Sequence, residues 1–234
     1  MKSTIQDKTQ LVNSVFSRVY KKYDLMNDIM SLGVHRIWKG KLIDWMNPQL
    51  NESLIDVASG TGDIAKLFSK KNNNSAQITC VEPNDEMYST GKSNLKKFKN
   101  IKWYKAKAEK LPFKNDAYDF YTISYGIRNV SDINSSLREA LRVLKPGGRF
   151  MCLEFSKIDN EMINLLYQKY SKVIPFLGKY IVGSSKPYDY LIKSINEFYT
   201  QDELANLMKK NGFSNVEYRN LSNGISAIHS GWKI

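Results

Sequence analysis

The sequence predicts an α/β fold in which helices cover both faces of a seven-stranded, mostly parallel sheet. From residue 53 onward, short apolar segments alternate with helical stretches of about ten to fifteen residues, which is the pattern of βαβ units. The apolar segments are hydrophobic toward both sides, as strands buried between two helical layers require. The last two segments are separated only by a short turn, which predicts an antiparallel hairpin.

Residues 1–50 are expected to form an N-terminal helical cap. The stretch 11–23 repeats apolar residues at three- and four-residue spacings, which gives a helix one apolar face. A second amphipathic helix is predicted over 35–46, closely followed by Pro48.

Residues 51–157 carry the alternating pattern. The predicted helices cover 63–71, 84–98 and 132–144, and the predicted strands cover 53–58, 76–82, 101–106, 117–125 and 148–155. Pro146, Gly147 and Gly148 predict a tight structural turn between the last helix and the last strand.

The remaining chain divides into two parts. Residues 158–198 are rich in aromatic residues and interrupted by Pro and Gly, and we expect them to form a lid over the strand ends. In the final part, 199–234, Thr200 and Glu203 form a capping box at the start of a helix. The predicted β-hairpin of 214–221 and 224–234 follows that helix.

Length and composition describe an ordinary globular chain. At 234 residues and 42% hydrophobic residues, one domain can bury its own core without disulfides. Cys80 and Cys152 lie inside apolar segments and are expected to be reduced core residues. No stretch of about 18 apolar residues and no secretion signal is present, so we expect a cytoplasmic protein.

Charge is the unusual feature of the composition. The formal net charge is +12, and nine lysines but a single acid lie between residues 92 and 114. Such a surplus suggests an anionic partner, either the inner face of a membrane or a nucleic acid. However, 28 of the 35 basic residues are Lys, and specific phosphate recognition prefers Arg. Biased codon usage therefore remains an alternative explanation, and nucleic acid is the least favoured partner.

The sharpest motif is LIDVASGTGD, residues 54–63, in which a strand leads into a Gly-x-Gly turn that opens a helix. Gly60 and Gly62 allow the backbone to approach a ligand, and the helix start offers unpaired N–H groups. The segment also fits the dinucleotide fingerprint with Ala65 in third place, which keeps an NAD-dependent oxidoreductase open.

Two acidic residues favour a different ligand. Asp56 precedes the turn and suits a cationic group, whereas it would repel a pyrophosphate. Glu82 ends the second predicted strand, 22 residues after Gly60, where an acid accepts hydrogen bonds from ribose hydroxyls. A ribose together with a positive charge describes S-adenosylmethionine better than NAD.

The ends of the next two strands complete the expected site. Lys107 and Ala108 follow the third strand, where a backbone N–H and a side chain would contact the adenine ring. Ser124 and Tyr125 end the fourth strand and would lie beneath the methionine part of the ligand. Ligands in such sheets bind at the carboxyl ends of the strands, and each of these positions is one.

These features resemble a class I S-adenosylmethionine-dependent methyltransferase, which has a Rossmann-like fold. The chain resembles more closely the ubiquinone/menaquinone biosynthesis C-methyltransferase family. The resemblance covers nearly the whole chain and is carried by KYDLMNDIMSLGVHRIWK, DVASGTGD, AEKLPF, TISYGIRNV, RVLKPGGRFMCLEFSK and HSGWKI. It implies C-methylation of a polyprenylated benzoquinol or naphthoquinol ring at a membrane surface, by a single methyltransferase domain.

The resemblance places cofactor contacts at Thr61, Glu82, Lys107, Ala108 and Ser124. The chain departs from the family at Ser59, where Gly is usual, and at Glu82, where Asp is more frequent. Lys107 replaces an Asn or Asp. Because an ammonium group accepts no hydrogen bond, Lys107 should not reproduce the side-chain contact with the adenine amino group.

For catalysis, the quinol ring must be activated as a phenolate, and Arg128 is the candidate to stabilise that charge. A water, Tyr125 or His35 would then accept the proton. In the expected cap and site, the candidate substrate contacts are Tyr23, Asp24, Asn27 and Asn129. The reaction requires no metal, and no metal site is predicted.

Three alternatives stay open besides this function and the NAD-dependent oxidoreductase. The basic surface would suit an RNA methyltransferase, although SYGIRN replaces the motif usual for base N-methylation. Another small molecule could be the substrate. The chain could also be a non-catalytic scaffold, although Glu82 and the intact glycine turn argue against loss of the cofactor site. Assembly as a homodimer or within a quinone-biosynthesis complex is not determined by the sequence.

Overall fold

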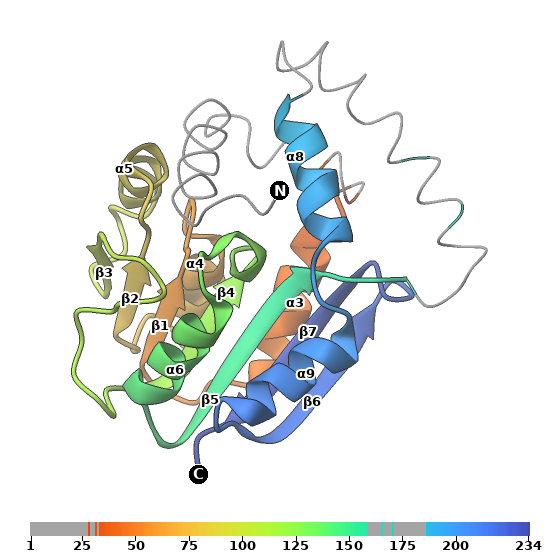
Figure 1. The fold of residues 1–234 in the computed structure, drawn as a ribbon. Coiled ribbons are helices and arrows are strands. Elements are labelled where there is room, and N and C mark those ends of the chain that lie inside the picture. The colour runs from red at the N-terminus through yellow and green to blue at the C-terminus, as the bar shows by residue number, and fades with distance from the viewer. Residues whose placement is uncertain (1–27, 29–30, 32, 159–164, 166–169, 171–185) are drawn as a thin grey trace.

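The computed structural model describes residues 28, 31, 33–158, 165, 170 and 186–234. The described residues form a seven-stranded sheet with the strand order β3-β2-β1-β4-β5-β7-β6 (Figure 1). The strand β7 runs antiparallel to both of its neighbours, β5 and β6, whereas the other pairs are parallel. This confirms the predicted α/β fold and the C-terminal hairpin.

The elements follow the predicted order. The strands are β1 (Leu54–Val57), β2 (Ile78–Val81), β3 (Ile101–Tyr104), β4 (Tyr118–Ser124), β5 (Leu144–Phe155), β6 (Ser214–Leu221) and β7 (Ser226–Trp232). The helices are α3 (His35–Met46), α4 (Asp63–Lys71), α5 (Asp85–Asn94), the short 3-10 helix η2 (Ile127–Asn129), α6 (Ile133–Val143), α8 (Lys186–Asn196) and α9 (Gln201–Lys210). None of these helices is long and apolar enough to cross a membrane.

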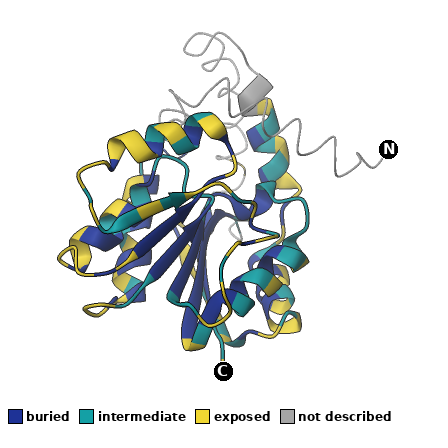
Figure 2. Cartoon of the chain, turned by 90° about the vertical axis from the view of Figure 1, so that its left-hand side faces the viewer, coloured by how far each residue is buried: buried dark blue, intermediate teal, exposed yellow. Residues whose placement is uncertain are grey.

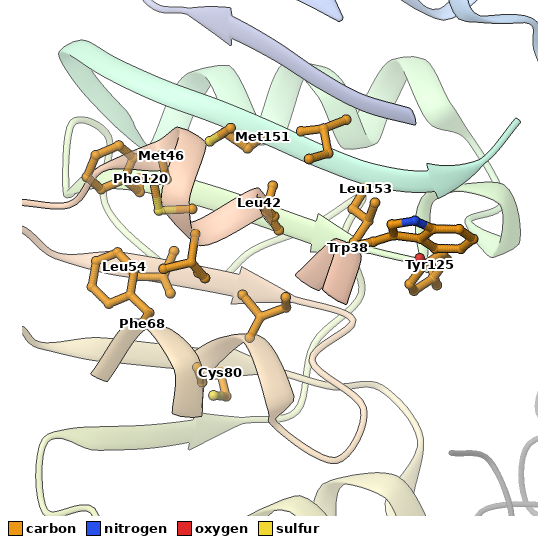
Figure 3. Packing of buried hydrophobic residues seen from close by; sticks show 14 of the residues in the cluster. Trp38, Leu42, Met46, Leu54, Phe68, Cys80, Phe120, Tyr125, Met151 and Leu153 are labelled. Carbon is orange, nitrogen blue, oxygen red and sulfur yellow. The ribbon is translucent and has the colours of Figure 1, made fainter. Parts of the chain in front are cut away.

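Two hydrophobic clusters lie on opposite faces of the sheet. On one face, Trp38, Leu42 and Met46 of α3 pack with α4 and with side chains from β1, β4 and β5 (Figure 3). On the other face, α6 and α9 cover the sheet. Figure 2 shows the result, with buried strands between helices whose outer faces are exposed.

The edge strands differ from the prediction that strands are apolar toward both sides. Every residue of β1 and β2 is buried, but β3 and β6 alternate between less and more exposed positions. In β3, for example, Lys102 and Tyr104 are exposed. An edge strand has a neighbour on one side only, so it needs fewer apolar residues and benefits from charged ones.

The predicted turn at Pro146–Gly148 is wrong, because these residues belong to β5, which begins at Leu144 directly after α6. The N–H of Gly147 donates to the carbonyl of Lys233 at 2.7 Å, which ties this stretch to the C-terminal end of the chain. Gly147 has a φ of +79°. The register of β5 against β4 also shifts between Tyr118 and Phe120. The segment is thus an irregular start of a strand.

Part of the predicted cap lies outside the described residues. This applies to the helix expected over 11–23, to Tyr23, Asp24 and Asn27, and to most of the lid expected over 158–198. The helix predicted over 35–46 is confirmed as α3. The capping box of Thr200 and Glu203 is present at the start of α9.

Gly91 tests how closely α5 must approach the rest of the fold. A Cβ atom at this position would lie 2.3 Å from the Trp103 ring and 2.8 Å from the carbonyl oxygen of Gly60. We expect Gly91→Ala to lower the unfolding free energy by about 1–3 kcal/mol, as overpacking of a tight contact does. Urea unfolding followed by circular dichroism measures the change.

Gly40 supplies the matched control, because it also lies within a helix but has open space around its Cα. Gly40→Ala should raise the unfolding free energy by about 0.5–1 kcal/mol, since Ala loses less backbone entropy than Gly. Destabilisation by Gly40→Ala of the same size as that by Gly91→Ala would contradict the packing explanation.

Candidate functional site

A pocket lies at the carboxyl ends of the central strands. Among the described residues, its wall combines the segments that follow β1, β2, β3 and β4 with one residue of α3. The wall residues are Lys39, Asp56, 57–61, Asp63, Ile64, 82–84, Met87, 107–109, 124–126 and 129–131. The predicted cofactor residues Asp56, Gly60, Thr61, Glu82, Lys107, Ala108 and Ser124 are therefore brought together.

The glycine turn after β1 has the expected left-handed backbone. Gly60 and Gly62 have φ values of +56° and +89°, and Gly62 is the N-cap of α4. Gly62 was predicted to contact the cofactor, but it is not among the described residues that line the pocket. A Cβ atom on Gly62 would lie 2.5 Å from a methyl group of Leu95. The role of Gly62 in the structure is thus close packing beneath the turn.

Glu82 connects the turns that follow β1 and β2. One of its carboxylate oxygens accepts from the N–H of Gly60 at 2.9 Å, and the other accepts from the N–H of Asn84 at 3.0 Å. Burial raises the pKa of Glu82 to about 7, although both of these bonds lower it. A carboxylate oxygen can accept more than one hydrogen bond, so Glu82 can still accept from ligand hydroxyls.

Asp56 is buried and lines the pocket. The hydroxyl of Thr122 donates to one carboxylate oxygen at 2.8 Å, and the other oxygen has no hydrogen-bond partner among the described residues. Burial raises the pKa of Asp56 to about 7. A cationic ligand group beside this oxygen would favour the ionised carboxylate.

The ends of β1 and β4 meet in strained conformations. Ala58 and Tyr125 both have positive φ values, +53° and +56°, which are uncommon for residues other than Gly. A Cβ atom on Gly126 would lie 2.6 Å from the Cβ of Ala58, so the two turns are in close contact. Such strain is frequent where a fold shapes a ligand site. The hydroxyl of Ser124, in the same wall, has no partner among the described residues.

Tyr125 lines the pocket and is held by other aromatic residues. Its ring lies 4.9 Å from that of Phe155, and the Trp38 ring lies 6.3 Å from Phe155. Figure 3 shows the Trp38 and Tyr125 side chains. Asn129 also lines the pocket, and its side-chain carbonyl accepts from the hydroxyl of Tyr190 at 3.0 Å. This bond connects α8 to the site.

Arg128 lies behind the pocket wall, where it is buried. It forms an ion pair with Glu154 at 3.2 Å and donates to the carbonyl of Tyr125 at 2.6 Å. Burial raises the pKa of Glu154, although the charge of Arg128 lowers it. Arg128 thus supports the backbone of Tyr125, and it is not among the described residues that line the pocket.

His35 is also buried and is not among the described wall residues. Its Nε2 atom lies 2.8 Å from a carboxylate oxygen of Asp28. Burial lowers the pKa of His35, although the hydrogen bond with Asp28 raises it. Lys107, in contrast, is exposed at the adenine end of the predicted site.

Sequence reasoning missed three residues that shape this pocket. Lys39 lines it from α3, but nothing in the helical pattern distinguishes Lys39 from other lysines. Ser59 donates to the carbonyl of Asp56 at 2.6 Å and accepts from the N–H of Val81 at 3.1 Å. Asn84 caps α5 by accepting from the N–H of Met87 at 3.0 Å. An Asn just before the acidic start of a helix was a visible signal for this cap.

The strand order, the glycine turn and the acidic residue after β2 define the class I methyltransferase fold. A SAM-dependent methyltransferase from Thermotoga maritima superposes with a TM-score of 0.66 at 21% identity, covering 94% of this chain and 99% of that chain. A phosphoethanolamine N-methyltransferase from Haemonchus contortus, solved with S-adenosyl-L-methionine, superposes with a TM-score of 0.61 at 12% identity. That match covers 84% of this chain and 52% of the Haemonchus chain.

The chain belongs to the ubiE/COQ5 methyltransferase family, whose model matches residues 3–233. This confirms the family resemblance found in the sequence. The ubiquinone/menaquinone biosynthesis C-methyltransferase UbiE of Rickettsia bellii is 49% identical over 97% of this chain and 94% of its own length. The protein of the same name from Rickettsia massiliae is 50% identical over 96% of this chain and 93% of its own.

The burial of Asp56 predicts how stability depends on pH. Because the folded-state pKa is about 7 and the usual Asp value is lower, the folded protein holds a proton that the unfolded chain has released between these values. The contribution of Asp56 to stability therefore falls as the pH rises from the usual Asp pKa to about 7, and it stays constant above that. Asp56→Asn should have nearly wild-type stability at about pH 4 and exceed it at about pH 8 by on the order of 2–4 kcal/mol.

Urea unfolding of the ligand-free protein at the two pH values measures this difference. The control is Asp44→Asn, because Asp44 is an exposed acid of α3 that pairs with Lys71 at the surface. It should change the unfolding free energy little at either pH. An equal effect of Asp56→Asn at both pH values would contradict the prediction.

Proposed function

We propose that this protein transfers a methyl group from S-adenosylmethionine to a ring carbon of a polyprenylated quinol in ubiquinone or menaquinone biosynthesis. The observation that carries the proposal is the 49% identity, over 97% of the chain, to a relative named for that reaction. The pocket adds support, because its polar groups match the chemical groups of the cofactor.

The fit to the cofactor rests on groups with free hydrogen-bonding capacity. Glu82 would accept from the ribose hydroxyls, and the second oxygen of Asp56 would pair with the cofactor ammonium. Ala108 would contact the adenine end of the cofactor through its backbone. Thr61 would contact the amino-acid end through its hydroxyl group. When bound, the cofactor supplies an activated methyl group on a sulfonium.

The substrate ring would lie at the end of β4, beside Tyr125 and Asn129. A quinol hydroxyl has a pKa near that of Tyr, about 10, and its phenolate is the better carbon nucleophile. The buried charge of Arg128 lies directly behind Tyr125, where it would stabilise negative charge in the pocket and orient the wall. We therefore treat Arg128 as a positioning residue for ring ionisation. Tyr125 or a water would accept the proton.

Quinone analysis of a strain without the gene tests the proposed function. Mass spectrometry should reveal a polyprenylated precursor that lacks one ring methyl group, and the mass of that precursor identifies the ring. Reintroducing the gene should restore the methylated quinone. A normal quinone profile in the deletion strain, with methylated RNA nucleosides lost instead, would favour the RNA methyltransferase alternative.

Glu82→Ala tests the cofactor assignment. Loss of hydrogen bonds to a charged acceptor costs roughly 1.5–3 kcal/mol, so the affinity for S-adenosylmethionine should fall at least tenfold. Isothermal titration calorimetry measures it, with Glu197→Ala as the control at an exposed acid of an ion pair with Lys193. Wild-type affinity should also weaken below about pH 7, because Glu82 and Asp56 become protonated. Unchanged affinity in Glu82→Ala would contradict the assignment.

Arg128 requires a double variant, because removing Arg128 alone leaves Glu154 buried without its partner. Arg128→Ala should lower the unfolding free energy by about 3–5 kcal/mol. In Arg128→Met/Glu154→Gln both charges are removed, so most of that stability should return.

If Arg128 promotes ring ionisation, turnover of the double variant should stay about a hundredfold below wild type while cofactor affinity changes little. The deficit should shrink at high pH, where the quinol ionises unaided. The measurement is a pH–rate profile of the folded double variant. Near-normal turnover at every pH would show that Arg128 only stabilises the fold.

We also propose that the protein visits an anionic membrane surface, where its insoluble substrate would reside. The nine lysines between 92 and 114 are all exposed, and they lie at the end of α5, on the segment between α5 and β3, on β3, and on the loop that follows β3. Lysines near an anionic surface contribute roughly 1 kcal/mol each at low salt. This lysine surface is the candidate contact, with the protein at the inner face of the membrane.

Liposome flotation tests this contact. The protein should float with phosphatidylglycerol vesicles but not with phosphatidylcholine vesicles, and high salt should reduce the effect. Lys96→Glu/Lys97→Glu should weaken flotation, whereas Lys209→Glu/Lys210→Glu, an exposed pair at the end of α9, should weaken it less. No preference for anionic lipid would show that the lysine surplus reflects composition alone.

A further inference from the structure

Lys39 occupies an unusual place for a lysine. It lies in α3 among core residues, its side chain is only 9% exposed, and it lines the pocket. Its ammonium group donates to a carboxylate oxygen of Asp63 at 2.7 Å. Buried lysines are rare and need a partner, so this position for a positive charge demands an explanation.

The charges around the pocket are strongly unbalanced. Its described wall contains four acidic side chains, Asp56, Asp63, Glu82 and Glu109, and two basic ones, Lys39 and Lys107. Glu109 accepts a hydrogen bond from the N–H of Ser131 at 2.6 Å, so this carboxylate bonds to another residue of the pocket wall. Lys107 is exposed and follows β3. Lys39 is therefore the cation on the β1 side of the described wall.

Lys39 and Asp56 act on the same part of the pocket. The charge of Lys39 lowers the pKa of Asp56, although burial raises that pKa more strongly. Asp56 carries a carboxylate oxygen that has no partner among the described residues. This end of the pocket thus holds the Asp56 carboxylate near the Lys39 ammonium, which is paired with Asp63, and an anionic and a cationic group together suit a zwitterion.

We propose that Lys39 binds the carboxylate of the amino-acid part of S-adenosylmethionine while Asp56 binds its ammonium group. The assignment rests on the proposed function, because it names a further contact with the same cofactor. Asp63 holds the Lys39 ammonium at the pocket wall, so that the cation is in place before the ligand binds. Lys39 would also discriminate against adenosyl compounds that lack a carboxylate.

The test compares two ligands in two proteins by calorimetry, without turnover. The ligands are S-adenosylhomocysteine and its decarboxylated analogue, which differ only in the carboxylate. Wild type should bind the complete ligand about tenfold or more tightly than the analogue. Lys39→Met should lose that preference, so that its affinity falls for S-adenosylhomocysteine and stays nearly constant for the analogue.

Asp63→Asn separates the proposed contact from the ion pair. This variant keeps Lys39 but removes its charged partner, and it should still prefer the ligand with the carboxylate. If Lys39→Met weakens both ligands equally, or neither, the assignment is overturned. If the wild-type protein binds neither ligand, both the proposed function and the assignment of Lys39 are overturned. If it binds both ligands without preferring the one with the carboxylate, only the role of Lys39 is overturned.

Discussion

The site depends on the carboxylate of Glu82, which accepts one backbone N–H from each of two loops. Its bonds to Gly60 and Asn84 fix the turn after β1 against the turn after β2. Gly91 of α5 then packs against the carbonyl of Gly60 and the ring of Trp103, which leaves no space for a side chain. One carboxylate and one missing Cβ atom thus determine where the glycine turn lies, and with it the start of α4.

This arrangement places charge where it is costly. Glu82 and Asp56 are both buried, and burial raises the pKa of each to about 7. Neither acid has a salt bridge among the described residues, in contrast to Glu154, which pairs with Arg128. An acid without a counter-ion at the end of a parallel strand is poorly placed for stability but well placed for a ligand that brings hydroxyls and a positive charge. The electrostatic cost in the free protein becomes affinity when such a ligand binds.

The fold class, the glycine turn and most of the pocket wall could be predicted from the sequence, because each depends on local chemistry. Gly60, Glu82 and Ser124 stand at strand ends, and the ends of parallel strands meet at one edge. The sequence could not place Arg128 correctly relative to the wall, since its partner Glu154 is 26 residues away. It also took Pro146–Gly148 for a turn, because the backbone pairing with Lys233 that extends β5 comes from the far end of the chain.

Ser59 shows how structure explains a departure from the family pattern. The family usually has Gly at this position, but Ser59 has no positive φ, so a side chain is allowed there. Its hydroxyl bonds to Asp56 and to Val81, and so joins the ends of β1 and β2 by a second route beside Glu82. The substitution therefore adds a contact to the same junction and leaves the conformation of the glycine turn to Gly60 and Gly62.

The helix α3 joins the core and the site in one element. Trp38, Leu42 and Met46 anchor one face of α3 in the hydrophobic cluster, with Trp38 beside Tyr125 (Figure 3). Lys39, the residue after Trp38, reaches the pocket and pairs with Asp63 at the start of α4. Because the same helix packs on the sheet and closes one side of the pocket, the position of Lys39 is set by core packing and not by a flexible loop. The helix α3 is thus a structural part of both the core and the pocket wall.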